Sequence, residues 1–81
     1  MTETLVSARI RERVQQRRDL PPPSTCRALR QAAGLRIADV AEAVGVTTQA
    51  VSYWELGRRT PRGRYREAYL EALNALREVA A

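Results

Sequence analysis

The chain contains no histidine, no phenylalanine and no lysine, and it has a single cysteine among its 81 residues. One cysteine excludes a disulfide bond within the chain. Without histidine, neither a structural zinc site nor a histidine-based catalytic group is available. No pairing of a nucleophile with a base is visible either. We therefore expect a protein that is not an enzyme and that uses no cofactor and no metal.

Long apolar runs are also missing. No stretch approaches the roughly 20 apolar residues that a membrane-spanning helix needs, and no signal peptide precedes the domain. We expect a cytoplasmic protein that does not contact a membrane. The length allows one small domain. Because aromatic residues are few, its core must be aliphatic, with Trp54 as the largest side chain and Cys26 as a small core residue.

The positive charge of the chain is unevenly distributed. All 14 basic residues are arginine, and the formal net charge is +5. The segment 67–81 is net acidic, so the excess of arginine lies in the first twenty residues and around residues 57–66. A basic stripe of this kind is the electrostatic footprint of a protein that binds a polyanion.

The segment 37–57, IADVAEAVGVTTQAVSYWELG, carries two short helical patterns. In the first, apolar residues follow the spacing of one helical face at Ile37, Val40, Ala41 and Val44. Gly45 can close this helix in the left-handed conformation. Thr47 can cap the next helix by accepting a hydrogen bond from the amide of Gln49 or Ala50. Two short helices joined by about three residues predict a helix-turn-helix.

The second helix has an apolar side and an uncharged polar side. Val51 and Trp54, three residues apart, form the inward side. The outward side offers amide and hydroxyl groups, from Thr48, Gln49, Ser52 and Tyr53. Such groups can bind base edges in the major groove, where a glutamine pairs with adenine through two hydrogen bonds. We therefore expect these four residues to contact DNA bases.

Five arginines follow directly, and no acidic residue occurs from Leu56 to Arg66. In DNA recognition, phosphate contacts position the protein and base contacts specify the sequence. Cations beside the helix suit the first kind of contact, and uncharged polar side chains on the helix suit the second. The phosphate contacts that we expect from this loop are Arg58, Arg59, Arg62 and Arg64.

The stretch from about Ser24 to Leu76 resembles the helix-turn-helix domain of phage repressors and Cro proteins, the XRE family. The resemblance is carried by the motif GL-x-IADVAEAVGV-T-x-QAVS-x-WE-x-G-x-x-x-P. It implies a lambda-repressor-like, all-α bundle of four core helices, to which an extra N-terminal helix is added. It also places Thr48, Gln49, Ser52 and Tyr53 at the base-contacting positions of the recognition helix.

The same resemblance implies two further features. Arg30 and Glu55 are similar to an ion pair that ties the first helix of the domain to the recognition helix. The family often has a glutamine where Ile37 stands and uses it on a phosphate, which Ile37 cannot do. Arg36, next to it, is the expected substitute, and Thr47 is a further expected phosphate contact.

The chain divides into three parts. Residues 1–20 form a basic helical extension, with a helix over 2–18 that Thr2 caps and that carries the apolar stripe Val6, Ile10 and Val14. Residues 21–23 are a proline spacer that no helix crosses. Residues 24–81 form the helix-turn-helix domain. Its helices are expected at 25–33 with Ser24 as cap, at 37–44, at 48–56, and at 64–79 with Tyr65, Tyr69, Ala72, Leu73, Leu76 and Ala80 on its core face.

These patterns predict a regulator of transcription, of the repressor kind, that binds double-stranded DNA as a homodimer through helix 48–56. Three interpretations of residues 1–20 remain open: a solvated helix lying on the domain, a dimerisation helix, or a basic arm along DNA. The alternative function is a protein-interaction module or antitoxin with the same fold, which would bind its protein partner through residues 2–18.

Overall fold

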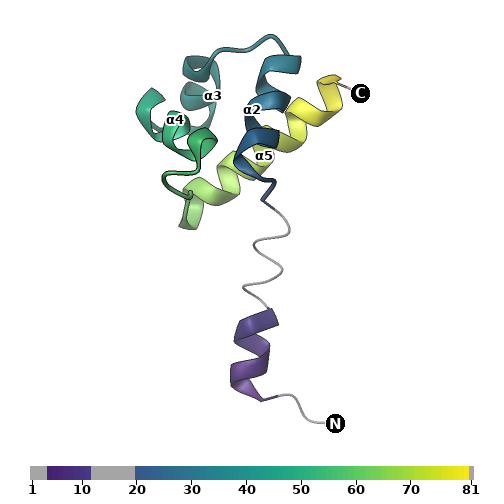
Figure 1. Cartoon of the computed structure of the whole chain (residues 1–81), viewed down its shortest axis with the longest axis vertical. Coiled ribbons are helices and arrows are strands. Elements are labelled where there is room, and N and C mark those ends of the chain that lie inside the picture. The colour runs from purple at the N-terminus through teal and green to yellow at the C-terminus, as the bar shows by residue number, and fades with distance from the viewer. Residues whose placement is uncertain (1–3, 12–19, 81) are drawn as a thin grey trace.

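The computed structural model describes residues 4–11 and 20–80, the side chain of Ala80 excepted. Its helices are α2 (Pro23–Ala32), α3 (Ile37–Val44), α4 (Thr48–Leu56) and α5 (Gly63–Ala80), and residues 5–11 are also helical (Figure 1). No strand occurs in the described ranges, so the all-α prediction is confirmed. In the same ranges, no helix combines the length and the hydropathy that a membrane crossing requires.

Local signals set the bounds of α3 and α4, and both helices begin and end where the sequence predicted. Gly45 closes α3 with a φ of 86°, and Gly57 closes α4 with a φ of 74°. The left-handed region is open to glycine because it has no Cβ. The amide of Ala50 donates to the Thr47 hydroxyl at 3.1 Å, which confirms Thr47 as the cap of α4.

The start of α2 differs from the prediction. Pro22 occupies the cap position and Pro23 is the first helical residue, so the expected cap at Ser24 was wrong. Proline is well tolerated at this position because its missing N–H would have no partner there and its φ already suits a helix. Pro21 is buried, and its carbonyl accepts a hydrogen bond from the Cys26 thiol at 3.5 Å. The segment 21–23 thus contacts the bundle and contains the start of α2, and no described helix runs through all three prolines.

The N-terminal helix also begins later than expected. The amide of Ser7 donates to the Thr4 hydroxyl at 3.1 Å, so Thr4 caps the helical residues 5–11. The predicted cap, Thr2, lies outside the described residues, as does the predicted stretch 12–18 with Val14.

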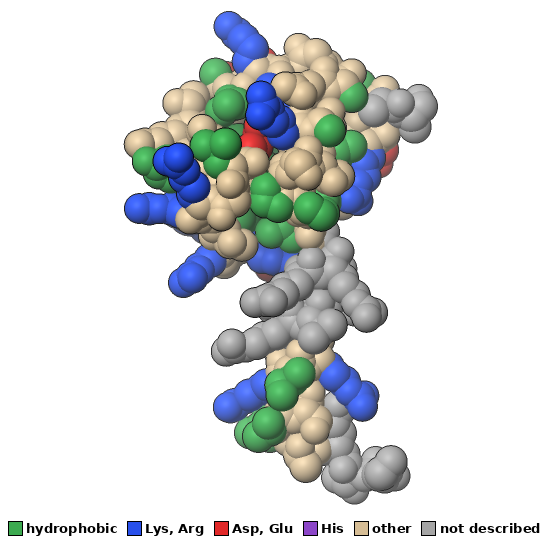
Figure 2. Space-filling view, in the orientation of Figure 1, with side chains coloured by type: hydrophobic (Ala, Val, Ile, Leu, Met, Phe, Trp, Pro, Cys, Tyr) green, Lys and Arg blue, Asp and Glu red, His purple; other side chains and the backbone are tan. Residues whose placement is uncertain are grey.

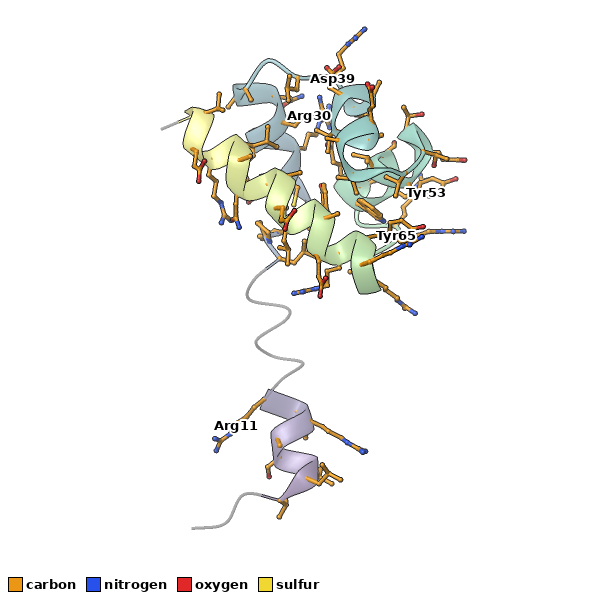
Figure 3. The ribbon with its side chains drawn as sticks, turned by 180° about the vertical axis from the view of Figure 1, so that it is seen from behind. Arg11, Arg30, Asp39, Tyr53 and Tyr65 are labelled. Atoms are coloured by element: carbon orange, nitrogen blue, oxygen red, sulfur yellow. The ribbon has the colours of Figure 1, made fainter. Side chains whose placement is uncertain are left out.

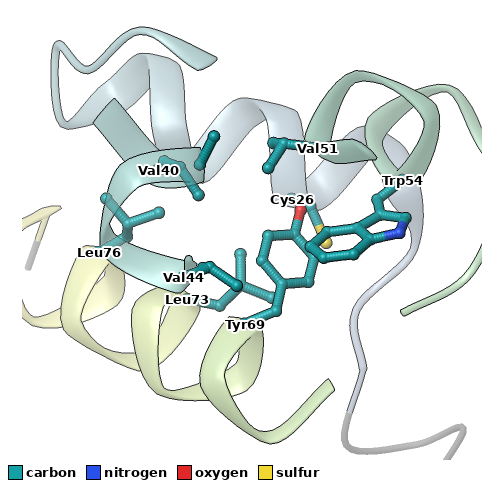
Figure 4. Close-up of a cluster of buried hydrophobic side chains, with 9 residues drawn as sticks. Cys26, Val40, Val44, Val51, Trp54, Tyr69, Leu73 and Leu76 are labelled. Carbon is teal, nitrogen blue, oxygen red and sulfur yellow. The ribbon is translucent and has the colours of Figure 1, made fainter. Parts of the chain in front are cut away.

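The core lies between α5 and the other three helices of the bundle (Figure 4). Its buried apolar residues are Cys26, Val40, Ala41, Val44, Val51, Trp54, Tyr69, Leu73 and Leu76. The rings of Trp54 and Tyr69 pack with centroids 4.8 Å apart and planes inclined by 49°. Burial raises the pKa of the Cys26 thiol and of the Tyr69 hydroxyl, so both stay neutral at physiological pH and act as packing groups. Tyr65, which was expected on this face, is 39% exposed.

An ion pair joins α2 to α4 inside the bundle. Arg30 donates through Nε and Nη2 to the two carboxylate oxygens of Glu55, at 2.7 and 2.8 Å. Its Nη1 donates to the carbonyl of Leu35 at 2.9 Å, which ties in the connection to α3. The two-bond geometry fixes the rotation of α4 about its own axis. This pair was expected from the family resemblance, and its orientation of α4 decides which side chains reach the surface.

Candidate nucleic-acid interface

The packing of α4 leaves its polar side at the surface. Val51 is fully buried and Trp54 is 9% exposed, so both point into the core as predicted. The four expected base-contacting residues lie on the remaining sides of the helix, with Thr48 and Gln49 exposed and Ser52 and Tyr53 half-buried. None of their side chains carries a charge at neutral pH. The helix therefore presents hydrogen-bonding groups, and the exposed Leu56, on the outside of the bundle.

A chain of contacts links Gln49, Tyr53 and Arg59. The amide of Gln49 donates through Nε2 to the Tyr53 hydroxyl at 2.7 Å. The guanidinium carbon of Arg59 lies 5.4 Å from the centroid of the Tyr53 ring, within the range of a cation–π contact. Tyr53 therefore holds the side chain of Gln49 in one orientation and keeps the Arg59 cation beside the helix. Sequence reasoning treated Tyr53 as a base contact only and missed this role.

The arginines after α4 are attached to a firmly anchored loop. The amides of Arg58 and Arg59 both donate to the Tyr53 carbonyl, at 2.9 and 3.4 Å, and Pro61 is buried. The side chains of Arg58, Arg59 and Arg62 remain exposed. Figure 2 shows arginine side chains projecting at the left edge of the bundle, over α4 and the start of α5. The loop thus presents exposed cations on a fixed backbone beside the polar side of α4.

Arg64 and Tyr65 form a second arginine–tyrosine contact at the start of α5. The Arg64 guanidinium donates to the Tyr65 hydroxyl at 3.0 Å and lies 5.0 Å from the ring centroid. Tyr65, at the surface, thus has a polar partner for its hydroxyl. In the view of Figure 3, Tyr53 on α4 and Tyr65 at the start of α5 lie toward the same edge of the bundle.

Arg36 lies in a different electrostatic setting from the loop arginines. Its Nε is 3.5 Å from Asp39 Oδ2, and its backbone N–H donates to the same oxygen at 2.8 Å. These two hydrogen bonds lower the pKa of Asp39, which is thus ionised at neutral pH. The carboxylate offsets part of the positive charge that Arg36 would offer to a phosphate. Thr47, the other phosphate contact expected outside the loop, is exposed, with its hydroxyl engaged as the cap of α4.

The family comparison matches the part of the chain that forms the bundle. A protein-family model described as a helix-turn-helix domain covers residues 25–81, and the helical residues 5–11 lie outside the match. Neither a comparison with curated proteins nor one with solved structures gave a match. The matched family is the helix-turn-helix domain in general, so the narrower resemblance to phage repressors and Cro proteins stays a prediction.

Proposed function

Because the chain belongs to the helix-turn-helix domain family, whose members bind DNA and are typically not enzymes, we propose that it regulates transcription as a sequence-specific binder of double-stranded DNA. One observation carries the proposal. The uncharged polar side of α4 reaches the surface, and the segment that follows it, from Leu56 to Arg66, carries five arginines and no acidic residue.

The dimensions of α4 suit the major groove. Its nine residues span about 14 Å at a rise of about 1.5 Å per residue, and the major groove is about 12 Å wide and admits an α-helix. In this arrangement Thr48, Gln49, Ser52 and Tyr53 face the base edges. The loop arginines Arg58, Arg59 and Arg62 face the sugar–phosphate backbone, as do Arg64 at the start of α5, Arg36 and Thr47.

We propose further that the protein forms a homodimer and acts as a repressor. One recognition helix contacts only a few base pairs, and a two-fold pair of helices reads two half-sites about 34–36 Å apart. A dimer bound across a promoter acts by occluding it, and the protein performs no chemistry on the DNA. The XRE-like resemblance of segment 37–57 supports the repressor reading.

Replacing Gln49 by alanine is expected to weaken binding to the cognate site by about 1–3 kcal/mol, the value of a bidentate base contact. Binding to unrelated DNA should stay the same, because phosphate contacts supply it. Fluorescence anisotropy on the cognate site and on a shuffled duplex measures both values. The cognate site is first obtained by selecting bound fragments from genomic DNA.

Gln31→Ala is the matched control, since Gln31 is an exposed glutamine on α2 and should affect neither DNA. Tyr53→Phe keeps the ring but removes the hydroxyl that accepts from Gln49. It should therefore reduce the preference for the cognate site by less than Gln49→Ala does. An equal loss on both duplexes for Gln49→Ala would show that Gln49 does not contact a base.

Replacing Arg58 or Arg59 by alanine should reduce the slope of log K against log salt concentration by about 0.9 for each phosphate that is no longer neutralised. The reason is that each arginine bound to a phosphate releases condensed counterions from the duplex. Titrations of unrelated duplex DNA at several salt concentrations measure the slope. Arg77→Ala, on the part of α5 remote from α4, is the control. If the Arg58 or Arg59 variant has the same slope as the unaltered protein, that arginine does not contact a phosphate.

A second candidate function is a protein-interaction module of the antitoxin kind, which would bind its partner through residues 2–18. The observation in its favour is the apolar surface of Leu5, Val6 and Ile10, which are 58–66% exposed. Selection from genomic fragments separates the two candidates. A protein whose main role is to bind another protein yields no enriched sequence, whereas the regulator yields a defined site.

A further inference from the structure

An apolar groove of about 280 Å³ lies on the bundle away from the arginine loop, which is the segment 57–62 between α4 and α5. It lies between α3 and the second half of α5, and Ala33 and Leu35, at the end of α2 and in the connection to α3, also line it. The apolar residues that shape it include Leu35, Val40, Ala43, Ala75, Leu76 and Val79. Leu35 and Val79 remain exposed at its edges. The alanines leave room in the groove, so a side chain from another helix can enter it.

The helical residues 5–11 provide a matching apolar face. Val6 and Ile10 are four residues apart and therefore lie on one side of the helix, while Leu5 lies about 100° around the helix from Val6. These three side chains are 58–66% exposed, so the chain's own bundle does not cover them. A small amphipathic helix that lies in an apolar groove is a common mode of recognition between proteins.

The charges around the two surfaces are opposite. Glu71 and Glu78 lie one turn before and one turn after Ala75, on the flank of α5 beside the groove and outside its lining. Asp39 lines the groove on α3, although Arg36 offsets part of its charge. The helical residues 5–11 carry Arg9 and Arg11 and no acidic residue. An arginine-bearing helix is therefore attracted to this groove, whereas duplex DNA is repelled by it.

The start of the bundle lies far from the groove. Leu20 and Pro21 sit beside Trp54 and Tyr69, and the ten residues of α2 carry the chain about 15 Å from there to the groove end. Figure 1 shows the helical residues 5–11 beyond the end of the bundle that is remote from the C-terminus, whereas Val79 places the groove near the C-terminus. In this arrangement the helix does not occupy the groove of its own bundle.

We propose that the groove receives residues 5–11 of a second copy of this chain, so that two copies exchange their N-terminal helices. Each copy then contributes one helix and one groove, which gives the closed, two-fold interface of a symmetric dimer. The exchange rests on the homodimer of the proposed function. It covers Val6 and Ile10 in both copies and leaves α4 and the loop arginines Arg58, Arg59 and Arg62 free for DNA.

The first test measures the dimer dissociation constant by sedimentation equilibrium, without DNA. Ile10→Asp, in a segment outside the core, and Ala75→Arg, which fills the groove from an exposed position, should each raise it by about tenfold or more. Glu67→Gln, on the exposed side of α5, is the control. Circular dichroism checks that each variant remains folded.

A charge exchange gives an independent measure of the same interface. Arg9→Glu should weaken the dimer, and adding Glu78→Arg should restore part of the loss. A chain that stays monomeric throughout, or a dimer that none of Ile10→Asp, Ala75→Arg and Arg9→Glu weakens, overturns the proposal. Because DNA is absent, this failure leaves the results on Gln49 and Arg58 untouched and is distinguishable from a failure of the DNA-binding proposal.

Cross-linking identifies which chain supplies the helix. Copies carrying Ile10→Cys are mixed with copies carrying Ala75→Cys and oxidised with oxidised glutathione, while the buried Cys26 stays protected. Helix exchange predicts a covalent dimer in the mixture and far less in either copy alone. A chain carrying both substitutions that closes into a covalent monomer instead would show that the helix occupies its own groove, which overturns the exchange.

Discussion

Replacing Glu55 by alanine is expected to reduce the free energy of unfolding by about 3–5 kcal/mol, because removing one partner of a buried ion pair leaves an uncompensated charge. The side chains of Arg30 and Glu55 are only 11% and 4% exposed. Both hydrogen bonds between them, at 2.7 and 2.8 Å, are absent from the variant. Since small domains are stable by about 5–15 kcal/mol in total, much of the population should unfold on mild heating.

Urea unfolding followed by circular dichroism measures this loss. Glu42→Ala is the matched control, because Glu42 is an exposed glutamate on α3 and its removal should change stability by less than about 0.5 kcal/mol. The double variant Arg30→Met with Glu55→Met should recover much of the loss, since apolar residues often replace a buried pair without cost. Equal effects for Glu55→Ala and Glu42→Ala would show that the pair contributes nothing to stability.

Replacing Trp54 by alanine is expected to cost about 3–5 kcal/mol, the usual range for truncating a buried tryptophan. The indole packs against Tyr69 with ring centroids 4.8 Å apart and lies among the core residues that join α4 to α5. Its removal leaves a cavity that the surrounding aliphatic side chains only partly fill. The domain is small enough that this loss should abolish the fold at 37 °C, and DNA binding should disappear with it.

Thermal unfolding followed by circular dichroism at 222 nm measures the effect, because tryptophan fluorescence is lost with the residue. Leu56→Ala is the control on the same helix. Leu56 is 57% exposed, and the loss of an exposed apolar side chain should change stability by about 0.5 kcal/mol or less. If Trp54→Ala were as mild as Leu56→Ala, α4 would have to be held by other contacts.

The bounds of α3 and α4 could be predicted because the signals are local. The apolar period of 37–44, the left-handed glycines Gly45 and Gly57, and the Thr47 cap each act within a few residues of the backbone that they shape. Those signals alone also placed Val51 and Trp54 on the inward side of α4. Once that side is inward, the uncharged polar side must face out, which is why the candidate interface was recognisable.

The start of α2 and the position of Tyr65 could not be predicted in the same way. A run of prolines favours an extended chain, yet its last member also fits the first position of a helix. The outcome depended on Pro21, which is buried in the bundle. Tyr65 has the spacing of a core residue, yet it is 39% exposed and contacts its sequence neighbour Arg64. The apolar period alone does not specify where along α5 the core ends, because that depends on which other elements cover the helix.

The sequence by itself determined the helix-turn-helix, because helical period and capping need no knowledge of distant residues. It also determined that arginines without acidic neighbours follow the polar side of α4. Only the tertiary structure decided that Tyr53 joins Gln49 to Arg59, that Asp39 offsets part of the Arg36 charge, and that an apolar groove opens between α3 and α5. Contacts of this kind depend on how helices and loops pack together, and side-chain spacing along one helix does not specify that packing.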